Sequence, residues 1–279
     1  MLTETLAAHR VIRLGMPHLA FAGLSETWML MECGHQHWTM LAERIQSSLE
    51  DLADAHGNPI YASFVCHRIH GSLEGLQSGN DVHLESRLHQ LSSKRFYSLH
   101  SLAGIRVEMI SIFLRRRKGN QNGALVSCSP DCVLSCSPNA RDVGPVELEE
   151  SDHRIRGGDW LRHSGFENAS LEANLAEHMY RPAPATDFNG AQLLYFARYH
   201  EVADRAEWEL CKARNPRSVT SEREIFYLAN IDPGDRIVTR VVDWRAEPRR
   251  GFAHHMRLIR ESDHRLMAEV FTRKQDGAS

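Results

Sequence analysis

The chain has 279 residues, of which 42% are hydrophobic and 25% are charged, so the composition predicts a globular protein with room for two domains of ordinary size. A net charge of −3 and a pI near 6.6 argue against nucleic acid as the main partner. No run reaches the roughly 18 apolar residues of a membrane span, and residues 1–16 lack the apolar core of a signal peptide. We therefore expect a soluble cytoplasmic protein with no membrane partner.

The first predicted helix begins at a glycine-containing turn, FAGLSE, at residues 21–26. Apolar residues recur at helical spacing from Trp28 to Ile45. Gly34 lies inside this helix at a cost of about 1 kcal/mol relative to Ala, so a kink or a close contact is expected there. Four strand-like runs follow, at residues 60–69, 81–91, 94–102 and 105–117.

Residues 119–172 are rich in Gly, Ser, Asn, Pro and acidic residues, which predicts a long connection with some local structure. Cys128, Cys132 and Cys136 lie in this segment, with three residues between neighbours. Structural zinc sites usually add a second pair of ligands elsewhere. Because only three ligands are local, we expect reduced thiols on a loop and no metal site.

The second half begins with the stretch DFNGAQLLYFARYHEVADRAEW at residues 187–208. We interpret it as an acidic, glycine-containing turn that leads directly into a long aromatic helix. Asp187, Asn189 and Gly190 are expected at the mouth of this helix, with Tyr195 and the next aromatic residues just inside it. Strand-like runs follow at residues 235–244, 254–262 and 266–274, after a DPGD turn at residues 232–235.

Both halves thus show the same order of elements: a glycine turn, a long helix and several antiparallel strands. The turn SGND at residues 78–81 has the place in the first half that DPGD has in the second. A long helix followed by antiparallel strands predicts the α+β class. Its repetition predicts a structural repeat with little residue identity.

The repeated pattern resembles a tandem (double) hot-dog fold, in which an antiparallel sheet wraps each long helix. DFNGAQLLYFARYHEVADRAEW and the later NIDPGDRIV look like hot-dog thioesterases of the 4-hydroxybenzoyl-CoA type, and the similarity covers most of residues 180–275. The resemblance implies an N-terminal hot-dog domain at residues 1–145, a linker at 146–172 and a C-terminal hot-dog domain at 173–279.

A narrower resemblance depends on four stretches of the first half: MPHLAFAGLSETWMLMECGHQHW (16–38), GNPIYASFV (57–65), SLHSLAG (98–104) and SIFLRRRKGNQNGALV (111–126). Together they resemble the double hot-dog bifunctional acyltransferase/decarboxylases of leinamycin biosynthesis and related polyketide pathways, over nearly the whole chain. The resemblance implies an enzyme that removes CO2 from methylmalonyl-CoA and leaves propionyl on the phosphopantetheine thiol of an acyl carrier protein. It also implies a homodimer, and no cofactor other than these thioesters.

The key catalytic residue of that family is a tyrosine in the strand after the first helix, which matches Tyr61. Its hydroxyl could protonate or bind the enolate, or it could carry the acyl group between the two thiols. An unperturbed tyrosine has a pKa of about 10, so nucleophilic use needs a lowered pKa or a base nearby. His18, His67 and His100 are the candidate bases. The alternative is a strand tyrosine that only packs, with its hydroxyl satisfied.

Gly23, Leu24 and Ser25 stand at the start of the first helix. Decarboxylation leaves negative charge on the thioester oxygen, and a helix N-terminus offers unpaired amide groups and a positive dipole end. We therefore predict that these residues hold the oxyanion, and that Tyr61 faces them across a narrow tunnel. In the alternative, Ser25 only caps the helix and Glu26 favours its positive end.

Asp187 is the rival catalytic residue, because the matching Asp of the related thioesterases acts as nucleophile or base in hydrolysis. Asn189 and Gly190 could complete a second site at this helix mouth, although we favour a structural or pocket-lining role for all three residues.

Arg115, Arg116 and Arg117 end a predicted strand and could contact the phosphates of coenzyme A or an acidic carrier protein. A basic run at a strand end is, however, more often only solvated. Asn120, in the same tail, is a candidate pocket residue.

Three functions stay open at this point. The first is the decarboxylating acyltransferase, the second is an acyl-thioesterase that uses Asp187, and the third is a non-catalytic module that docks a carrier protein.

Overall fold

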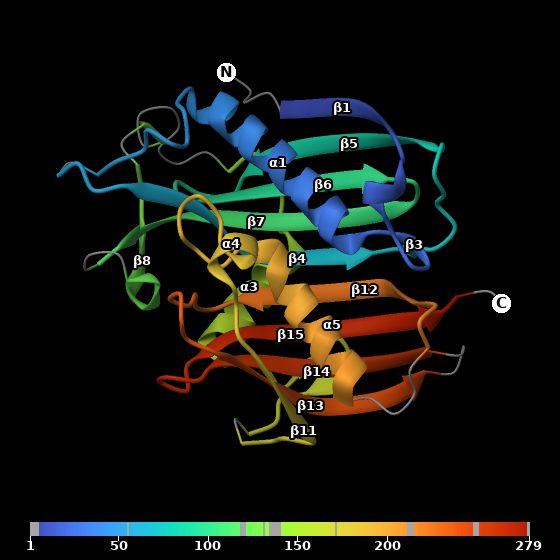
Figure 1. Ribbon diagram of the computed structural model, residues 1–279. Helices are drawn as coiled ribbons and strands as arrows, with labels where there is room; N and C mark the ends of the chain where they lie inside the picture. Colours follow the sequence, from blue (N-terminus) through green and yellow to red (C-terminus); the bar gives the residue numbers. More distant parts are fainter. Residues whose placement is uncertain are drawn as a thin grey trace.

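The computed structural model describes residues 6–54, 56–117, 121–130, 132–133, 141–170, 172–210, 215–247 and 251–277. These residues form one large antiparallel sheet with few helices (Figure 1), which confirms the α+β class. Within the described ranges, no helix is long and apolar enough to cross a membrane.

Each half consists of a strand, a long helix and four further strands. In the first half these elements are β1 (Leu6–Arg13), α1 (Glu26–Ile45), β4 (Ile60–His70), β5 (Asp81–Gln90), β6 (Arg95–Leu102) and β7 (Ile105–Arg116). In the second half they are β11 (Ala176–Tyr180), α5 (Tyr199–Leu210), β12 (Ser218–Tyr227), β13 (Ile237–Glu247), β14 (Gly251–Arg260) and β15 (Leu266–Asp276).

The strand order of the sheet is β1-β5-β6-β7-β4-β12-β15-β14-β13-β11. From the centre outward, the first half runs β4, β7, β6, β5, β1, and the second half runs through the corresponding strands β12, β15, β14, β13, β11. This correspondence confirms the structural repeat, and it shows that the two halves join through β4 and β12. Three of these strands, β1, β11 and β12, were not predicted.

The helices α1 and α5 cover the same face of the sheet, α1 over the first half and α5 over the second (Figure 1). Leu30 of α1 and Val202 of α5 belong to one buried core. A Cβ atom at Gly34 would lie only 2.7 Å from Cζ of Phe196, so the close contact expected at Gly34 is confirmed.

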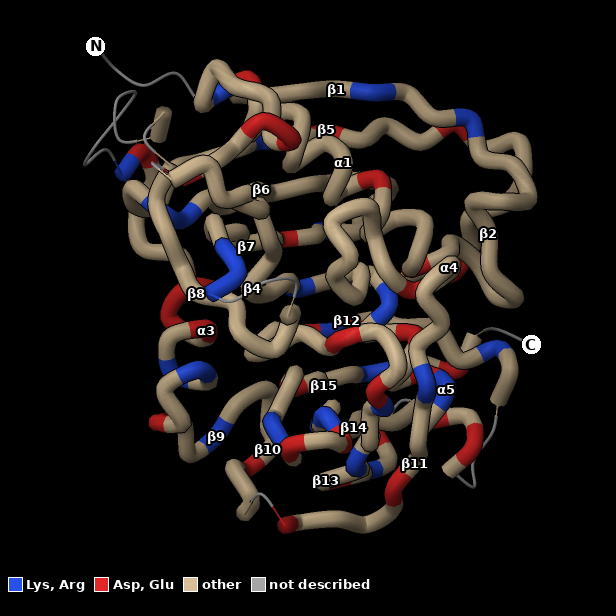
Figure 2. The backbone as a smooth tube through the Cα atoms, turned by 60° about the vertical axis from the view of Figure 1, so that its left-hand side comes forward, with Lys and Arg blue, Asp and Glu red and all other residues tan. Residues whose placement is uncertain are grey.

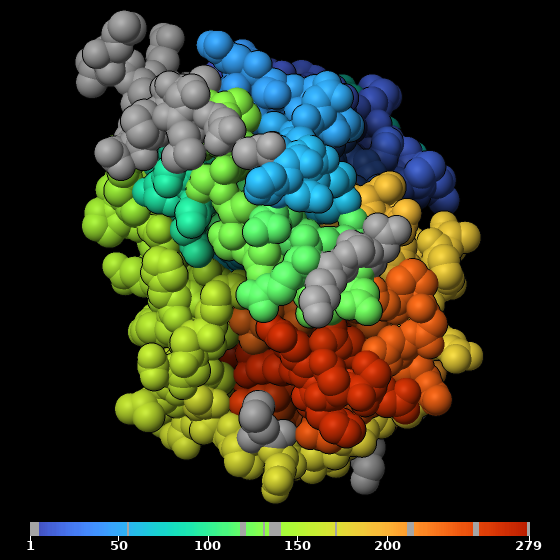
Figure 3. All heavy atoms as spheres, turned by 90° about the vertical axis from the view of Figure 1, so that its left-hand side faces the viewer, coloured from blue at the N-terminus to red at the C-terminus, as the bar shows by residue number. Residues whose placement is uncertain are grey.

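The opposite face is covered by the segment between the halves, which is more than a plain connection. It contains α3 (Glu147–Gly157) and the short hairpin of β9 (Arg162–His163) and β10 (Phe166–Glu167). Leu148, Trp160 and Phe166 are buried there against strand residues of both halves, and Figure 3 shows the yellow-green atoms of this segment beside green first-half and red second-half atoms. The ranges assigned to two domains and a linker stay a prediction.

The short elements are η1 (Met16–His18), β2 (Leu19–Ala20), β3 (Gly23–Leu24), η2 (Asn122–Ala124), β8 (Leu125–Cys128), α4 (Pro184–Asp187) and η3 (Phe196–Arg198). The segment between Asp187 and α5 corrects one prediction: the turn at Asp187 does not lead directly into the helix. A loop closed by a hydrogen bond from the Tyr195 N–H to the Asp187 carbonyl comes first, and α5 begins only after η3, at Tyr199.

Candidate active site

The central feature of the site is a split in the sheet between β4 and β12. Only the second part of β4, Cys66–His70, pairs with β12. The first part pairs with β7 on its other side, with a register shift between Phe64 and Cys66, and β12 ends at Tyr227. A cavity of about 460 Å³ lies where the two strands separate.

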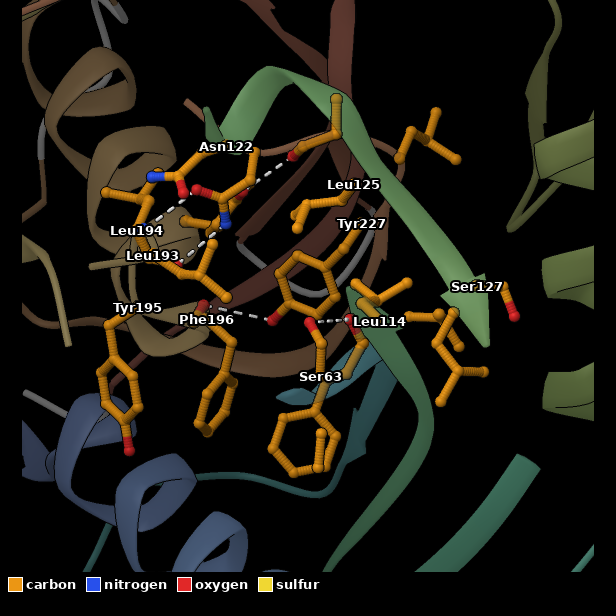
Figure 4. Close-up of a pocket in the computed structure, with 18 of the residues that line it drawn as sticks. Ser63, Leu114, Asn122, Leu125, Ser127, Leu193, Leu194, Tyr195, Phe196 and Tyr227 are labelled. Atoms are coloured by element: carbon orange, nitrogen blue, oxygen red, sulfur yellow. Dashed lines mark hydrogen bonds between the residues drawn. The ribbon is translucent and has the colours of Figure 1, made fainter. Parts of the chain in front are cut away.

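One wall of the cavity is aromatic and comes from α1, β4 and η3. Trp38 packs on Phe64 with ring centroids 4.2 Å apart, and Phe64 packs on Phe196 at 4.6 Å. Figure 4 shows the rings of Tyr195 and Phe196 pointing toward α1. Leucines close much of the remaining surface: Leu114, Leu125, Leu193 and Leu194.

The part of the cavity near α3 is cationic and is lined by Lys94, Arg95 and Arg156. Arg95 and Arg156 both donate to the carboxylate of the fully buried Asp152, at 2.6 and 3.0 Å. Arg156 also donates to the carbonyl oxygens of Val65 and Tyr227, at 3.3 and 2.8 Å. This arginine therefore satisfies backbone groups at the point where the two strands separate.

Tyr61 lies beside the cavity, because the residues that follow it in β4, Ala62 and Ser63, line the wall. The Tyr61 phenol oxygen accepts a hydrogen bond from Nη1 of Arg116, and the guanidinium lies 4.6 Å from the centre of the Tyr61 ring. Arg116 also donates to Oδ1 of Asn122, at 2.9 and 3.1 Å, and to the Ala191 carbonyl at 2.6 Å. The sequence had suggested a contact with coenzyme A phosphates for Arg116, whereas the structure makes it the partner of Tyr61.

Asn122 connects this group to the second half. It lines the cavity, and its side-chain amide donates to the carbonyls of Gln192 and Ile231, while its backbone N–H donates to Asp232 at 2.7 Å. The hydrogen bonds therefore fix the position of Tyr61 relative to the loop that precedes η3.

The start of α1 lies at the other end of β4, so the expected tunnel between Tyr61 and this helix start is wrong. Leu24 donates its N–H to the carbonyl of Leu73, beyond the end of β4, at 2.8 Å, whereas Tyr61 lies near the beginning of that strand. Nine residues of strand from Tyr61 to His70 span about 30 Å. The two groups of predicted residues therefore cannot bind the same small acyl group.

Several amide groups at this helix start, those of Leu24, Ser25 and Trp28, are also already hydrogen bonded. Ser25 donates its N–H to the His18 carbonyl at 2.9 Å, and its hydroxyl accepts from the Trp28 N–H at 3.2 Å, as expected for a helix cap. Gly23 has φ of +150°, and a Cβ atom there would lie 2.1 Å from the Leu73 carbonyl. The close backbone contact therefore explains why this position is a glycine, and no substrate contact is needed to explain it.

None of the three candidate histidines lies beside Tyr61. His18 accepts from the Gly15 N–H and packs on Trp28, at the distant start of α1. His100 is level with Ile69 of β4 through their common partner in β7, eight residues or about 26 Å along the sheet from Tyr61. His67 is six residues away, or about 20 Å, and hydrogen bonds to the Tyr227 hydroxyl at 2.7 Å.

Burial shifts the pKa of two of these histidines, His67 and His100. Burial lowers the pKa of His100 to about 3, and burial together with His200 and Arg223 lowers that of His67 well below its ordinary value. His100 belongs to a buried chain in which its two nitrogens hydrogen bond to Ser86 and Ser98, each at 2.8 Å.

Asp187 has a structural setting. Its side chain is buried, and Oδ2 accepts from the Tyr180 hydroxyl at 2.9 Å and from the Ala183 N–H at 2.6 Å. Asn189 does line the cavity, while its Oδ1 accepts from two loop amides at 3.1 Å. A Cβ atom at Gly190 would meet nothing within 4 Å, and its φ is not positive, so this position does not require glycine.

The remaining candidates lie farther from the cavity wall. Arg115 is 3.9 Å from the Asp54 carboxylate, and Arg117 is exposed. Asn120 lies outside the described residues. No group of three or more His, Cys, Asp or Glu residues in the described ranges could hold a metal ion. Cys128 is a free thiol and Cys132 is half-buried, and Cys136 lies outside those ranges.

Sequence reasoning missed Asn122, Arg156 and Tyr227. Asn122 is only two residues after the proposed Asn120, and the asparagine-rich run GNQNG was the available signal. Tyr227 ends the unpredicted strand β12, whose alternating run SVTSEREIFY could have revealed it. Arg156 belongs to the segment that was interpreted as a linker, so no sequence signal pointed to the cavity.

A second pocket of about 670 Å³ lies at the start of α1, between this helix, β11 and α5. Beneath it lies a buried ionic network of residues from α1, α5, β12 and β15. Figure 2 shows positively and negatively charged positions, in blue and red, along the backbone of this part of the molecule. Arg223 is 3.4 Å from Glu26 and 2.7 Å from Asp204, and Lys274 pairs with Asp204 and Glu207 at 2.9 and 2.7 Å. In the structural repeat, the start of α1 corresponds to the start of η3 and α5. Charged groups therefore lie at the first helix start, where the second helix start has the aromatic cavity.

Neither a protein-family model nor a curated protein sequence matches this chain. Among solved structures, it is similar to the 12:0-ACP thioesterase from Umbellularia californica, with a TM-score of 0.65 and 11% identity over 96% of this chain and 94% of that one. It is also similar to an acyl-ACP thioesterase from Bacteroides thetaiotaomicron, with a TM-score of 0.60 and 10% identity over 96% and 98% of the two chains. At these identities the likeness concerns the fold alone, and it establishes that the chain has the double hot-dog fold.

Proposed function

We propose that this chain is an acyl-thioester enzyme that moves an acyl group from coenzyme A to the phosphopantetheine thiol of an acyl carrier protein, with Tyr61 as the residue that carries it. The observation behind this proposal is the phenol of Tyr61 held by Arg116, which Asn122 fixes at the edge of the cavity. The names of the structural neighbours, which act on acyl-ACP thioesters, agree with this class of substrate.

The chemistry follows from the positions of these groups. A guanidinium that donates to the phenol oxygen stabilises negative charge on it, so the oxygen attacks the thioester carbonyl, and the C–S bond breaks. The phenol proton passes to the departing sulfur, so coenzyme A leaves as a thiol and the acyl group stays on the phenol oxygen. The carrier sulfur then attacks this ester, the bond between the acyl carbon and the phenol oxygen breaks, and the proton of the carrier thiol passes to that oxygen, which restores the phenol.

The oxyanion that forms during each attack needs donors. The start of η3, which continues into α5, has no side-chain cap, and Tyr195 and Phe196 at this start line the cavity. Its free amide groups and positive dipole end suit an oxyanion. In this proposal the oxyanion site predicted at the start of α1 is therefore placed at the start of the second helix.

Decarboxylation of a malonyl-type substrate belongs to the same proposal. The electron pair of the C–C bond moves into the thioester as CO2 leaves, and the resulting enolate takes a proton from solvent to give propionyl. The aromatic wall of Trp38, Phe64 and Phe196 supports this step, because a carboxylate that loses its hydration there is destabilised relative to neutral CO2. The reaction needs no added cofactor. A homodimer stays a prediction.

The test is to incubate the protein with methylmalonyl-CoA and a holo carrier protein and to weigh the carrier by mass spectrometry. A carrier heavier by a propionyl group supports the proposal, and one heavier by methylmalonyl supports transfer without decarboxylation. Free acid with an unloaded carrier would identify a thioesterase. The absence of turnover with every acyl-CoA would favour the non-catalytic module that docks a carrier protein.

A further inference from the structure

We infer that Phe196 limits the length of the aliphatic acyl chain that the cavity accepts, and that Gly34 gives Phe196 the room it needs to do so. This inference rests on the proposed function, because it concerns the acyl group of the same thioester. The ligand class is an acyl thioester with a short, apolar acyl chain.

The cavity has two chemically different parts, which suggests how a thioester lies in it. The cationic part near α3 has Lys94, Arg95 and Arg156, and the aromatic wall has the packed rings of Trp38, Phe64 and Phe196. An aliphatic chain loses no hydrogen bonds when it packs on aromatic rings, whereas the amides of a pantetheine arm would. The acyl chain is therefore assigned to the aromatic wall.

Phe196 forms the part of this wall where the second half meets α1. A Cβ atom at position 34 would lie 2.7 Å from Cζ and 3.0 Å from Cε1 of Phe196, and 3.5 Å from Cε2 of Phe64. These are contacts with side chains, so a larger residue at position 34 moves rings and leaves the helix backbone in place. Phe196 also lines the cavity, so a ring pushed away from position 34 can move into the acyl site.

Two substitutions consequently change the cavity in opposite directions. Gly34→Ala pushes the Phe196 ring into the cavity and shortens the acyl site, while Phe196→Leu removes part of the ring and lengthens it. One methylene group in a fitted apolar pocket changes kcat/KM by roughly 10- to 200-fold. The kcat/KM values of the two variants should therefore differ for longer acyl chains and be similar for the shortest one.

The experiment measures kcat/KM for loading of the holo carrier from propionyl-, butyryl-, hexanoyl- and octanoyl-CoA. We expect Gly34→Ala to lower the hexanoyl-to-propionyl ratio at least tenfold and Phe196→Leu to raise it by a similar factor. Gly144→Ala is the matched control, since a Cβ atom there meets nothing within 4 Å, and it should leave all ratios unchanged. A general folding defect would lower kcat/KM for every substrate by the same factor and leave the hexanoyl-to-propionyl ratio constant.

Calorimetry with non-hydrolysable thioether analogues of the same acyl-CoAs gives a readout that does not depend on turnover. The proposed function fails if the wild-type protein loads none of the acyl groups, and the calorimetric series still decides the role of Phe196. The inference would be overturned if the hexanoyl-to-propionyl ratio of both variants equalled that of the wild-type protein, or if the protein bound none of the analogues.

Discussion

The starts of the two long helices have the same place in the structural repeat but different surroundings. At the start of α1, Ser25 caps the helix, the amides of Leu24 and Ser25 are hydrogen bonded, and a buried network around Arg223 lies below. At the start of η3 and α5, no side chain caps the helix, and the residues there line an aromatic cavity. The first start is therefore closed by a cap and an ionic network, whereas the second borders a cavity.

The topology explains why the cavity combines parts of both halves. The halves join through β4 and β12, so the unpaired edge of β4 faces the loop and helix start of the second half. Tyr61 consequently reaches Asn122 and Ala191 through Arg116. The predicted phenol therefore lies near the loop that leads into η3, and not near the start of α1.

The largest expected effect comes from Tyr61→Phe, which removes the proposed acyl carrier. We expect carrier loading to fall at least a thousandfold, which corresponds to about 4 kcal/mol in the activation free energy, with little change in the free energy of unfolding. Loading is followed by mass spectrometry, and unfolding by urea titration. Asp187→Asn is the control and should keep most of the loading. An inactive Asp187→Asn beside an active Tyr61→Phe would show that the wrong residue has been assigned.

Arg223→Met tests the other helix start. Arg223 is fully buried and pairs with Glu26 and Asp204, so its removal leaves buried carboxylates without their partner. The free energy of unfolding should fall by about 3 kcal/mol, measured by urea titration. Loading by the folded variant at low temperature should stay within about twofold of the wild type. Lost loading in a stable variant would mean that the start of α1 belongs to the site.

The two halves also differ in how they hold buried histidines. In the second half, His254 and His255 hydrogen bond to the carboxylates of Glu207 and Glu269. In the first half, His37 and His100 hydrogen bond only to serine hydroxyls. Burial lowers the pKa of both first-half imidazoles, that of His100 to about 3.

Burial also lowers the pKa of His67, His200 and His254, so acid should destabilise both halves, with His100 as the histidine that can be tested most directly. Below the unfolded pKa of about 6.5, the unfolded chain binds a proton at His100 that the folded chain does not, so stability falls as the pH falls toward 3. His100 contributes a loss of about 2 kcal/mol between pH 7 and pH 5. His100→Gln should reduce the difference in unfolding free energy between these two pH values by that amount. An unchanged difference would mean that His100 is protonated in the folded protein.

The sequence was sufficient for the parts of the fold that local patterns encode. The period of the apolar residues gave α1 and the strands β4 to β7, and the turns SGND and DPGD marked corresponding points of the repeat. The strands β1, β11 and β12 were missed, and β12 is the strand that joins the halves. Which strand edges meet depends on contacts across the whole chain, and no local period carries that information.

The candidate site shows the same limit. Tyr61 was identified from a resemblance, but its partners Arg116 and Asn122 were assigned to other roles or passed over. Tyr61 and Arg116 meet because β4 pairs with β7 at this point, and the loop around Ala191, 75 residues after Arg116 in the chain, adds a further contact to the guanidinium. The residue types were visible in the sequence, whereas the strand pairing and the loop contact that bring them together were not.

The smallest expected effect concerns the cap of α1 and sharpens the comparison of the two helix starts. Ser25→Ala removes the hydroxyl that accepts the Trp28 N–H and should lower the free energy of unfolding by about 1 kcal/mol. The amide of Ser25 keeps its bond to the His18 carbonyl, so the loop does not need to move, and Ser25→Thr should retain most of the stability because threonine also caps helices. Neither variant should change kcat/KM for carrier loading, because the proposed mechanism takes its oxyanion donors from the start of η3. A loss of loading in Ser25→Ala that Ser25→Thr restores would instead place the thioester oxygen at the first helix, and the second start would then be the structural one.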